Sequence, residues 1–185
     1  DQLLPFQRED FEGIFEAMNG LPVIIRLLDA PMHEFLPSRE ELIEEVTRLR
    51  CMGDDPAELE AKEELLATVE AMSEVNPMMG LRSVRAAIIR KGITEMQVRA
   101  IIEAGCRQAK KGVDVHTEIM IPLVSHVNEL EHEHKVVQAV AEQVMEEQGV
   151  QIDYKFGTMI ETPRGAVTAD ELAEWAEFFS FGTND

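Results

Sequence analysis

The sequence predicts an α/β protein with parallel strands, because short apolar runs alternate with longer amphipathic stretches along most of the chain. Two of these runs, residues 154–160 and 178–181, are followed closely by the carboxylates Glu161 and Asp185. In parallel barrels the carboxyl ends of the strands carry the chemistry. The chain contains roughly five candidate strands, whereas a (β/α) barrel needs eight to close. We therefore expect part of such a barrel.

The first element is an amphipathic helix that ends before Gly20 and Pro22. Residues 23–28 follow as an apolar strand that Arg26 interrupts. A guanidinium inside a buried strand must be paired or must face a site, because desolvating a lone charge is very costly. Arg26 is therefore the first candidate functional residue.

The middle of the chain is expected to be mainly helical. Ser38 and Glu41 have the spacing of a capping box and begin one helix. Two further helices are predicted at about residues 56–72 and 94–110. The turn-rich segment 76–85 lies between them and holds a very short strand at most.

In the last third of the chain, predicted strands again alternate with predicted helices. Residues 119–124 predict a strand, residues 128–148 a long acidic helix, and residues 154–160 and 178–181 two more strands. No linker or low-complexity segment separates these elements, so residues 1–185 are expected to form one domain.

The composition excludes several classes of partner. The chain has 36 acidic and 17 basic residues and a formal net charge of −19, whereas nucleic-acid binding requires a basic surface. No apolar run approaches the ~18 residues of a membrane span, and no basic and apolar leader is seen. Cys51 and Cys106 match no metal or redox motif. These features predict a soluble, cytoplasmic protein.

Glu161 and Asp185 form a candidate metal site. Each follows a predicted strand, so both are expected at one edge of the sheet. Mg²⁺ prefers one or two carboxylates, with substrate oxygens completing its octahedron. Either acid alone is more readily interpreted as an ordinary strand-end or helix-capping residue. Their combination with arginines in the same segments favours a shared site.

Five runs of residues resemble a known family. These runs are Arg26-Leu27-Leu28-Asp29, His33-Glu34-Phe35-Leu36-Pro37, Asn76-Pro77-Met78-Met79-Gly80-Leu81-Arg82, Gly157-Thr158-Met159-Ile160-Glu161-Thr162-Pro163-Arg164 and Phe178-Phe179-Ser180-Phe181-Gly182-Thr183-Asn184-Asp185. They resemble the pyruvate, phosphate dikinases, a branch of the phosphoenolpyruvate-utilising enzymes. The resemblance implies the carboxyl-terminal phosphoenolpyruvate/pyruvate domain, a TIM-like (β/α) barrel, of which this chain would supply roughly five of eight βα units.

The resemblance also implies an activity. Enzymes of this type convert ATP, phosphate and pyruvate reversibly into AMP, pyrophosphate and phosphoenolpyruvate, through a phosphohistidine on a separate domain. This chain would host the half-reaction in which a phosphoryl group passes between the phosphohistidine and pyruvate enolate. The expected cofactor is Mg²⁺, and the expected partners are phosphoenolpyruvate or pyruvate and the phosphohistidine domain.

Carried over residue by residue, the resemblance implies that Glu161 and Asp185 bind Mg²⁺ and that Arg26 and Arg82 are catalytic. Guanidinium groups suit this role because their planar, often bidentate hydrogen bonds neutralise phosphoryl oxygens. The residues expected to contact the substrate are Arg26, Arg82, Glu161, Gly182, Thr183, Asn184 and Asp185. Arg85 and Arg164 are more readily interpreted as orienting residues or as solvated charges at helix starts.

Parts of the family's machinery have no match here. The family supplies a proton-donating cysteine beyond the position of Asp185, and neither Cys51 nor Cys106 matches that motif. The nucleotide-binding and phosphohistidine domains and the first barrel strand are not recognised either. We therefore expect an incomplete barrel domain that is inactive by itself, with exposed sheet edges at residues 23–28 and 178–181 that favour a homo-oligomer.

Two other functions remain compatible with the residues. One is a different Mg²⁺-enolate barrel enzyme, such as a carbon–carbon lyase, which would use similar acids and arginines. The other is a non-catalytic acidic interaction module. Binding of Mg²⁺ with oxalate, a planar dianion similar to pyruvate enolate, separates the module from either enzyme.

Overall fold

The computed structural model describes residues 2–30, 36–53, 55–72 and 79–182. The chain forms two compact units. The sheet unit consists of residues 1–29 and 83–185, and the hairpin unit consists of residues 30–82.

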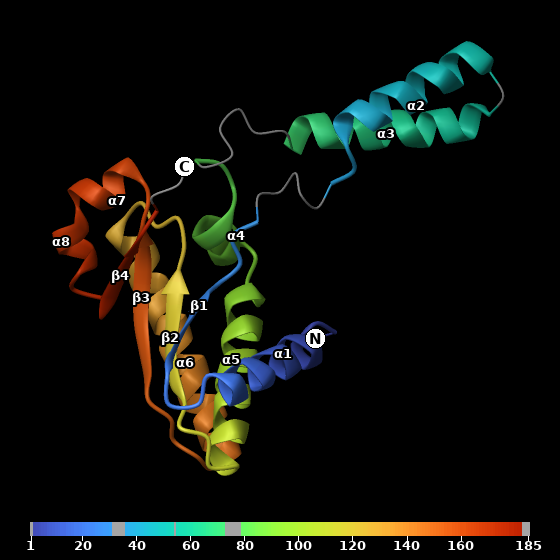
Figure 1. Ribbon diagram of the computed structural model, residues 1–185. Helices are drawn as coiled ribbons and strands as arrows, with labels where there is room; N and C mark the ends of the chain where they lie inside the picture. Colours follow the sequence, from blue (N-terminus) through green and yellow to red (C-terminus); the bar gives the residue numbers. More distant parts are fainter. Residues whose placement is uncertain (1, 31–35, 54, 73–78, 183–185) are drawn as a thin grey trace. The chain divides into compact units, whose positions relative to one another are not determined.

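The sheet unit contains four parallel strands in sequential order. They are β1 (Pro22–Arg26), β2 (His116–Ile121), β3 (Tyr154–Ile160) and β4 (Phe178–Phe181). Figure 1 shows them side by side in a curled sheet, with helices in the connections. The predicted α/β fold with parallel strands, part of a barrel, is confirmed. The described residues contain four strands rather than five, because residues 79–82 form a turn and Ser83 already begins a helix.

Six helices belong to this unit within the described residues: α1 (Leu4–Ala17), α4 (Ser83–Ile89), α5 (Ile93–Lys110), α6 (Val127–Gln148), α7 (Pro163–Val167) and α8 (Ala169–Leu172). Long helices α5 and α6 run along one face of the sheet (Figure 1). Among the described residues, no helix has both the length and the apolar content that a membrane crossing requires.

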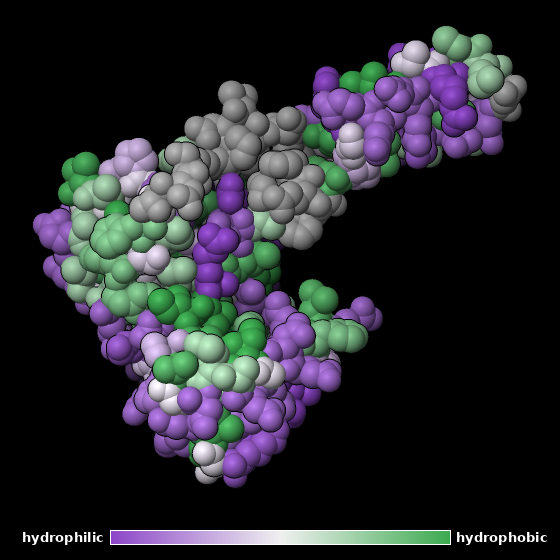
Figure 2. Space-filling view, viewed as in Figure 1, coloured by the Kyte–Doolittle hydropathy of each residue, from purple (hydrophilic) through white to green (hydrophobic). Residues whose placement is uncertain are grey.

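The core lies between the sheet and these helices. On β1, Val23 and Ile25 are buried in the core, whereas Ile24 between them is 53% exposed. This alternation is that of a strand covered on one face only. Figure 2 shows apolar surface over the strands on the face that the helices leave uncovered.

Strand β2 ends earlier than the sequence predicted. The expected strand reached residue 124, but pairing stops at Ile121. Pro122 lacks a backbone N–H for the ladder. Leu123 then takes a left-handed conformation, with φ of 54°, which no strand allows. The four residues 122–125 form a buried loop that leads into α6.

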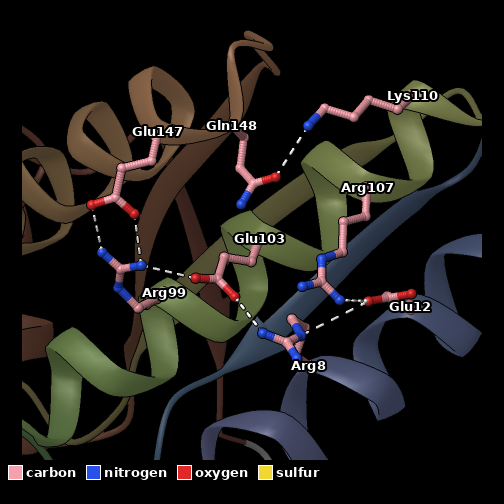
Figure 3. Close-up of polar contacts among 8 residues, drawn as sticks. All are labelled: Arg8, Glu12, Arg99, Glu103, Arg107, Lys110, Glu147 and Gln148. Atoms are coloured by element: carbon pink, nitrogen blue, oxygen red, sulfur yellow. Dashed lines mark hydrogen bonds and ion pairs between the residues drawn. The ribbon is translucent and has the colours of Figure 1, made fainter.

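Ion pairs join α1, α5 and α6 on the outer side of the unit (Figure 3). The Glu103 side chain, 7% exposed, accepts hydrogen bonds from Arg8 and from Arg99, each over 2.8 Å. Arg99 also binds Glu147 through both of its terminal nitrogens. The hydrogen bonds from Arg99 to Glu147 and to Glu103 raise the pKa of the Arg99 guanidinium.

The hairpin unit consists mainly of helices α2 (Arg39–Met52) and α3 (Pro56–Met72). The predicted cap is present, because the Ser38 hydroxyl accepts a hydrogen bond from the Glu41 backbone N–H. Leu42 and Val46 are buried within the unit. The rest of the hairpin surface is largely hydrophilic (Figure 2).

Candidate functional site

Three of the predicted site residues lie at the carboxyl ends of strands in the sheet. Arg26 is the last residue of β1, Glu161 directly follows β3, and Gly182 directly follows β4. Because the strands are parallel, these residues lie toward the same edge, although β2 separates β1 from β3. The register places Arg26 opposite Met120, which lies opposite Gly157, four residues before Glu161. The Gly182 N–H donates to the Ile160 carbonyl over 3.3 Å and extends the pairing beyond β4.

Arg26 presents a solvent-accessible guanidinium at this edge. Its side chain is 50% exposed, and its Nη1 lies 3.5 Å from Asp29 Oδ2. The Asp29 side chain is more enclosed, at 11% exposed, but half of the Arg26 side chain reaches solvent. The guanidinium is therefore accessible to an anionic ligand that approaches the edge.

Glu161 is partly buried and is held by the loop that follows β2. Its Oε1 accepts a hydrogen bond from the Leu123 backbone N–H over 2.7 Å. This short contact is typical of a charge-assisted hydrogen bond to a carboxylate. The backbone of the loop after the neighbouring strand thus orients the Glu161 side chain.

The loop 122–125 is fastened by polar side chains from other segments. Ser83 Oγ donates to the Pro122 carbonyl and Thr162 Oγ1 to the Val124 carbonyl, both over 2.9 Å. Arg85 Nη1 donates to the Leu123 carbonyl and to Ser125 Oγ, both over 3.2 Å. The sequence did not predict the roles of Ser83 and Thr162, because no local pattern shows which distant carbonyl a hydroxyl will bind.

The start of α6 continues this network. Glu129 Oε2 accepts hydrogen bonds from the Ser125 and His126 backbone N–H groups, over 2.8 and 3.1 Å. His126 Nδ1 accepts from the Asn128 N–H and caps the helix. The loop is therefore anchored to the helix layer as well as to the neighbouring strand.

A small cavity of about 20 Å³ lies behind the edge, between the loop and helices α4, α5 and α6. Glu133 lines it, is 2% exposed, and accepts a hydrogen bond from Thr94 over 2.7 Å. Burial raises the pKa of the Glu133 carboxyl, and the bond from Thr94 opposes this effect. Gln97, also at the cavity, accepts from the Leu28 N–H.

The remaining predicted site residues are Arg82, Thr183, Asn184 and Asp185. Arg82 belongs to the hairpin unit, where its N–H donates to the Gly80 carbonyl. Thr183, Asn184 and Asp185 lie outside the described residues. The described part of the chain contains no cluster of three or more histidine, cysteine or acidic residues that could hold a metal. The predicted sharing of a metal between Glu161 and Asp185 stays a prediction.

Comparisons with known proteins give one consistent result. Residues 2–185 match the family model described as "PEP-utilising enzyme, PEP-binding domain". The chain is 53% identical over its whole length to pyruvate, phosphate dikinase 1, chloroplastic, of Oryza sativa subsp. japonica. It is 52% identical to the chloroplastic pyruvate, phosphate dikinase of Mesembryanthemum crystallinum and 54% identical to pyruvate, phosphate dikinase 2 of Zea mays. The chain spans 19–20% of the length of these relatives.

The expectation of a cytoplasmic location is wrong in the light of these relatives, because those of rice and Mesembryanthemum crystallinum are named chloroplastic. The expectation rested on two unpaired thiols and on the lack of a recognisable leader. Cys51 and Cys106 are indeed free, but free thiols are compatible with any reducing compartment. Neither feature therefore identifies a location.

Proposed function

Because this chain belongs to the phosphoenolpyruvate-utilising enzymes and matches their phosphoenolpyruvate-binding domain, we propose that it binds phosphoenolpyruvate and pyruvate as part of a pyruvate, phosphate dikinase. The half-reaction transfers a phosphoryl group between a phosphohistidine and the enolate of pyruvate. The observation that supports this proposal is the Glu161 carboxylate, held by the Leu123 N–H at the carboxyl edge of the sheet, with Arg26 at the same edge.

Mg²⁺ is the proposed cofactor, with Glu161 and Asp185 as its ligands. Glu161 suits a hard cation, because it is a carboxylate that is partly buried and oriented by a hydrogen bond. When bound, Mg²⁺ neutralises negative charge that develops on substrate oxygens. The role of the rest of the chain is to hold and orient these two carboxylates.

Arg26 and Arg82 are the proposed catalytic clamps. Charge in phosphoryl transfer spreads over the equatorial oxygens, and a guanidinium can bind two of them in its plane. The exposed guanidinium of Arg26 at the edge supports its part of the proposal. Loss of one preorganised donor of this kind typically costs ~10²–10³ in rate.

Further contacts are proposed for the segment after β4. Gly182, Thr183, Asn184 and Asp185 are expected to contact the substrate, and the position of Gly182 directly after β4 supports this.

We also propose that residues 1–185 form one incomplete barrel domain and that the phosphohistidine domain of the whole protein is its partner.

A second copy of the chain is a further proposed partner. Strands β1 and β4 are the edges of the described sheet. Ile24 on β1 and Phe181 on β4 are 53% and 65% exposed. Exposed edges with apolar side chains favour pairing or packing between chains.

Calorimetric titration of the purified protein with oxalate, in the presence and absence of Mg²⁺, tests the proposed site. We expect Mg²⁺-dependent oxalate binding that Glu161→Gln weakens at least ~10-fold and that Arg26→Met also weakens. Asp153→Asn is the matched control, because it removes one carboxylate charge before the amino end of β3. Equal oxalate binding by Glu161→Gln and the unsubstituted protein contradicts the proposal. Oxalate binding of the same strength with and without Mg²⁺ contradicts it as well.

A further inference from the structure

Two residues other than glycine have a left-handed backbone among the described residues, and they lie on neighbouring segments of the site. They are Ser83, with φ of 53°, and Leu123, with φ of 54°. The Ser83 hydroxyl donates to the carbonyl of Pro122, directly before Leu123. Backbone strain of this kind persists only where surrounding contacts impose it, and it is found preferentially at functional sites.

Leu123 is held at both of its backbone groups. Its N–H donates to Glu161 Oε1 over 2.7 Å, and its carbonyl accepts from Arg85 Nη1 over 3.2 Å. Leu123 is 1% exposed, so its side chain is enclosed by the surrounding residues. Fixing the N–H and the carbonyl of one residue fixes its φ and ψ. Glu161 and Arg85 therefore hold the strained residue from opposite sides.

We propose that Arg85 is a positioning residue for Glu161 and acts through Leu123. Without the contact from Arg85, Leu123 loses one of the contacts that impose its left-handed conformation, and relaxation from this conformation turns its N–H away from Glu161. The carboxylate then loses a donor that orients it. This inference rests on the proposed function of Glu161 as a Mg²⁺ ligand.

The geometry of the contact suits an arginine better than a lysine. Arg85 Nη1 reaches both the Leu123 carbonyl and Ser125 Oγ. A planar guanidinium offers donors in a fixed geometry, whereas a lysine ammonium on a flexible chain does not. Ser83 supports this geometry, because its bond to Pro122 anchors the start of α4 two residues before Arg85. Arg85→Lys therefore keeps the charge but loses the geometry.

The first test measures hydrogen exchange of the Leu123 amide by NMR and needs no metal. We expect exchange of this amide to be about tenfold faster or more in Arg85→Met and intermediate in Arg85→Lys, with unchanged protection of β3 amides. Arg90→Ala, which removes an exposed arginine just after α4, is the control and should leave the Leu123 amide unchanged. Equal exchange of this amide in all variants overturns the proposal.

The second test measures the Mg²⁺ concentration at half-saturation of oxalate binding. We expect Arg85→Met to raise it ~10-fold or more, as is usual when an outer partner of a metal ligand is removed. Arg85→Lys should restore it only in part, and Arg90→Ala should match the unsubstituted protein.

The two ideas fail in different ways. If Glu161→Gln weakens binding but Arg85→Met does not, the positioning role is overturned and the proposed function stands. If Glu161→Gln binds Mg²⁺ and oxalate like the unsubstituted protein, the proposed function is overturned instead. In that case faster Leu123 exchange in Arg85→Met would show only that Arg85 holds the loop, and its role toward a metal ligand would be overturned as well.

Discussion

Glu133 is a carboxyl group enclosed by the helix layer, and it makes the stability of the fold depend on pH. Burial raises its pKa in the folded protein, so the folded state binds its proton more tightly than the unfolded state does. Its contribution to stability is therefore fully present below the unfolded pKa of about 4.3 and is lost as the pH rises through the folded pKa. Glu133→Gln, which stays neutral, should remove this loss.

Thermal unfolding at about pH 5 and pH 8 measures the effect. Both values lie above the ordinary pKa of a glutamate, so the Glu133 carboxyl is mostly ionised in the unfolded protein at either pH. We expect Glu133→Gln to raise the melting temperature by a few degrees at the higher pH and by less at the lower one. Glu131→Gln, at a partly exposed position on the same helix, should show no such difference. A larger stabilisation at the lower pH would contradict the assignment.

Gly157 is a position where any side chain would collide with the neighbouring strand. A Cβ there would lie 2.5 Å from the Phe178 carbonyl oxygen and 2.6 Å from its ring. Gly157→Ala should lower the free energy of unfolding by about 1–3 kcal/mol, because the pairing of β3 with β4 must shift. Gly13→Ala in α1, where no atom lies within 4 Å, should instead stabilise by about 0.5–1 kcal/mol. Denaturant titrations compare the two variants, and equal effects would exclude the collision.

Helices α1 and α5 are joined by a charge that is largely removed from solvent. Glu103 accepts hydrogen bonds from Arg8 on α1 and from Arg99 on its own helix (Figure 3). Glu103→Ala should cost about 2 kcal/mol, because both guanidinium groups lose an enclosed partner. Denaturant unfolding measures this loss.

Glu147 provides the matched comparison, because it also binds Arg99 but its side chain is 43% exposed. Glu147→Ala should cost less than Glu103→Ala, since solvent screens exposed ion pairs. The double variant should show coupling through Arg99, which both carboxylates share. If both single substitutions had the same small effect, burial of Glu103 would not matter for docking α1.

The sheet as a whole leaves both of its edge strands open among the described residues. We expect the purified chain to associate, and light scattering at low micromolar concentration should report a mass above that of one chain. Ile24→Lys should reduce the association, because a charged side chain on an edge strand opposes pairing. Val167→Lys, at an exposed position of α7, should not. A compact monomer with a cooperative melt would rule out the proposed second copy.

Local patterns in the sequence were sufficient for much of the fold. The predicted bounds of strands 154–160 and 178–181 and of helix 56–72 agree with β3, β4 and α3. Alternation of apolar residues, turn residues and caps act over a few neighbouring positions, so they can be interpreted without knowing what packs against them. The same local signals placed Glu161 directly after a strand, whereas Arg26, expected inside the strand 23–28, is the last residue of β1.

The loop after β2 depended on tertiary contacts. Several of its hydrogen bonds join residues that are 38 to 40 positions apart, such as Leu123 with Glu161 and Ser125 with Arg85. No local pattern predicts the left-handed backbone of Leu123, because an isolated leucine avoids that conformation and only its distant partners impose it. The burial of Glu133 has the same origin. It follows from how α6 packs against α4 and α5, and a single acidic residue on a helix does not reveal which face will be covered.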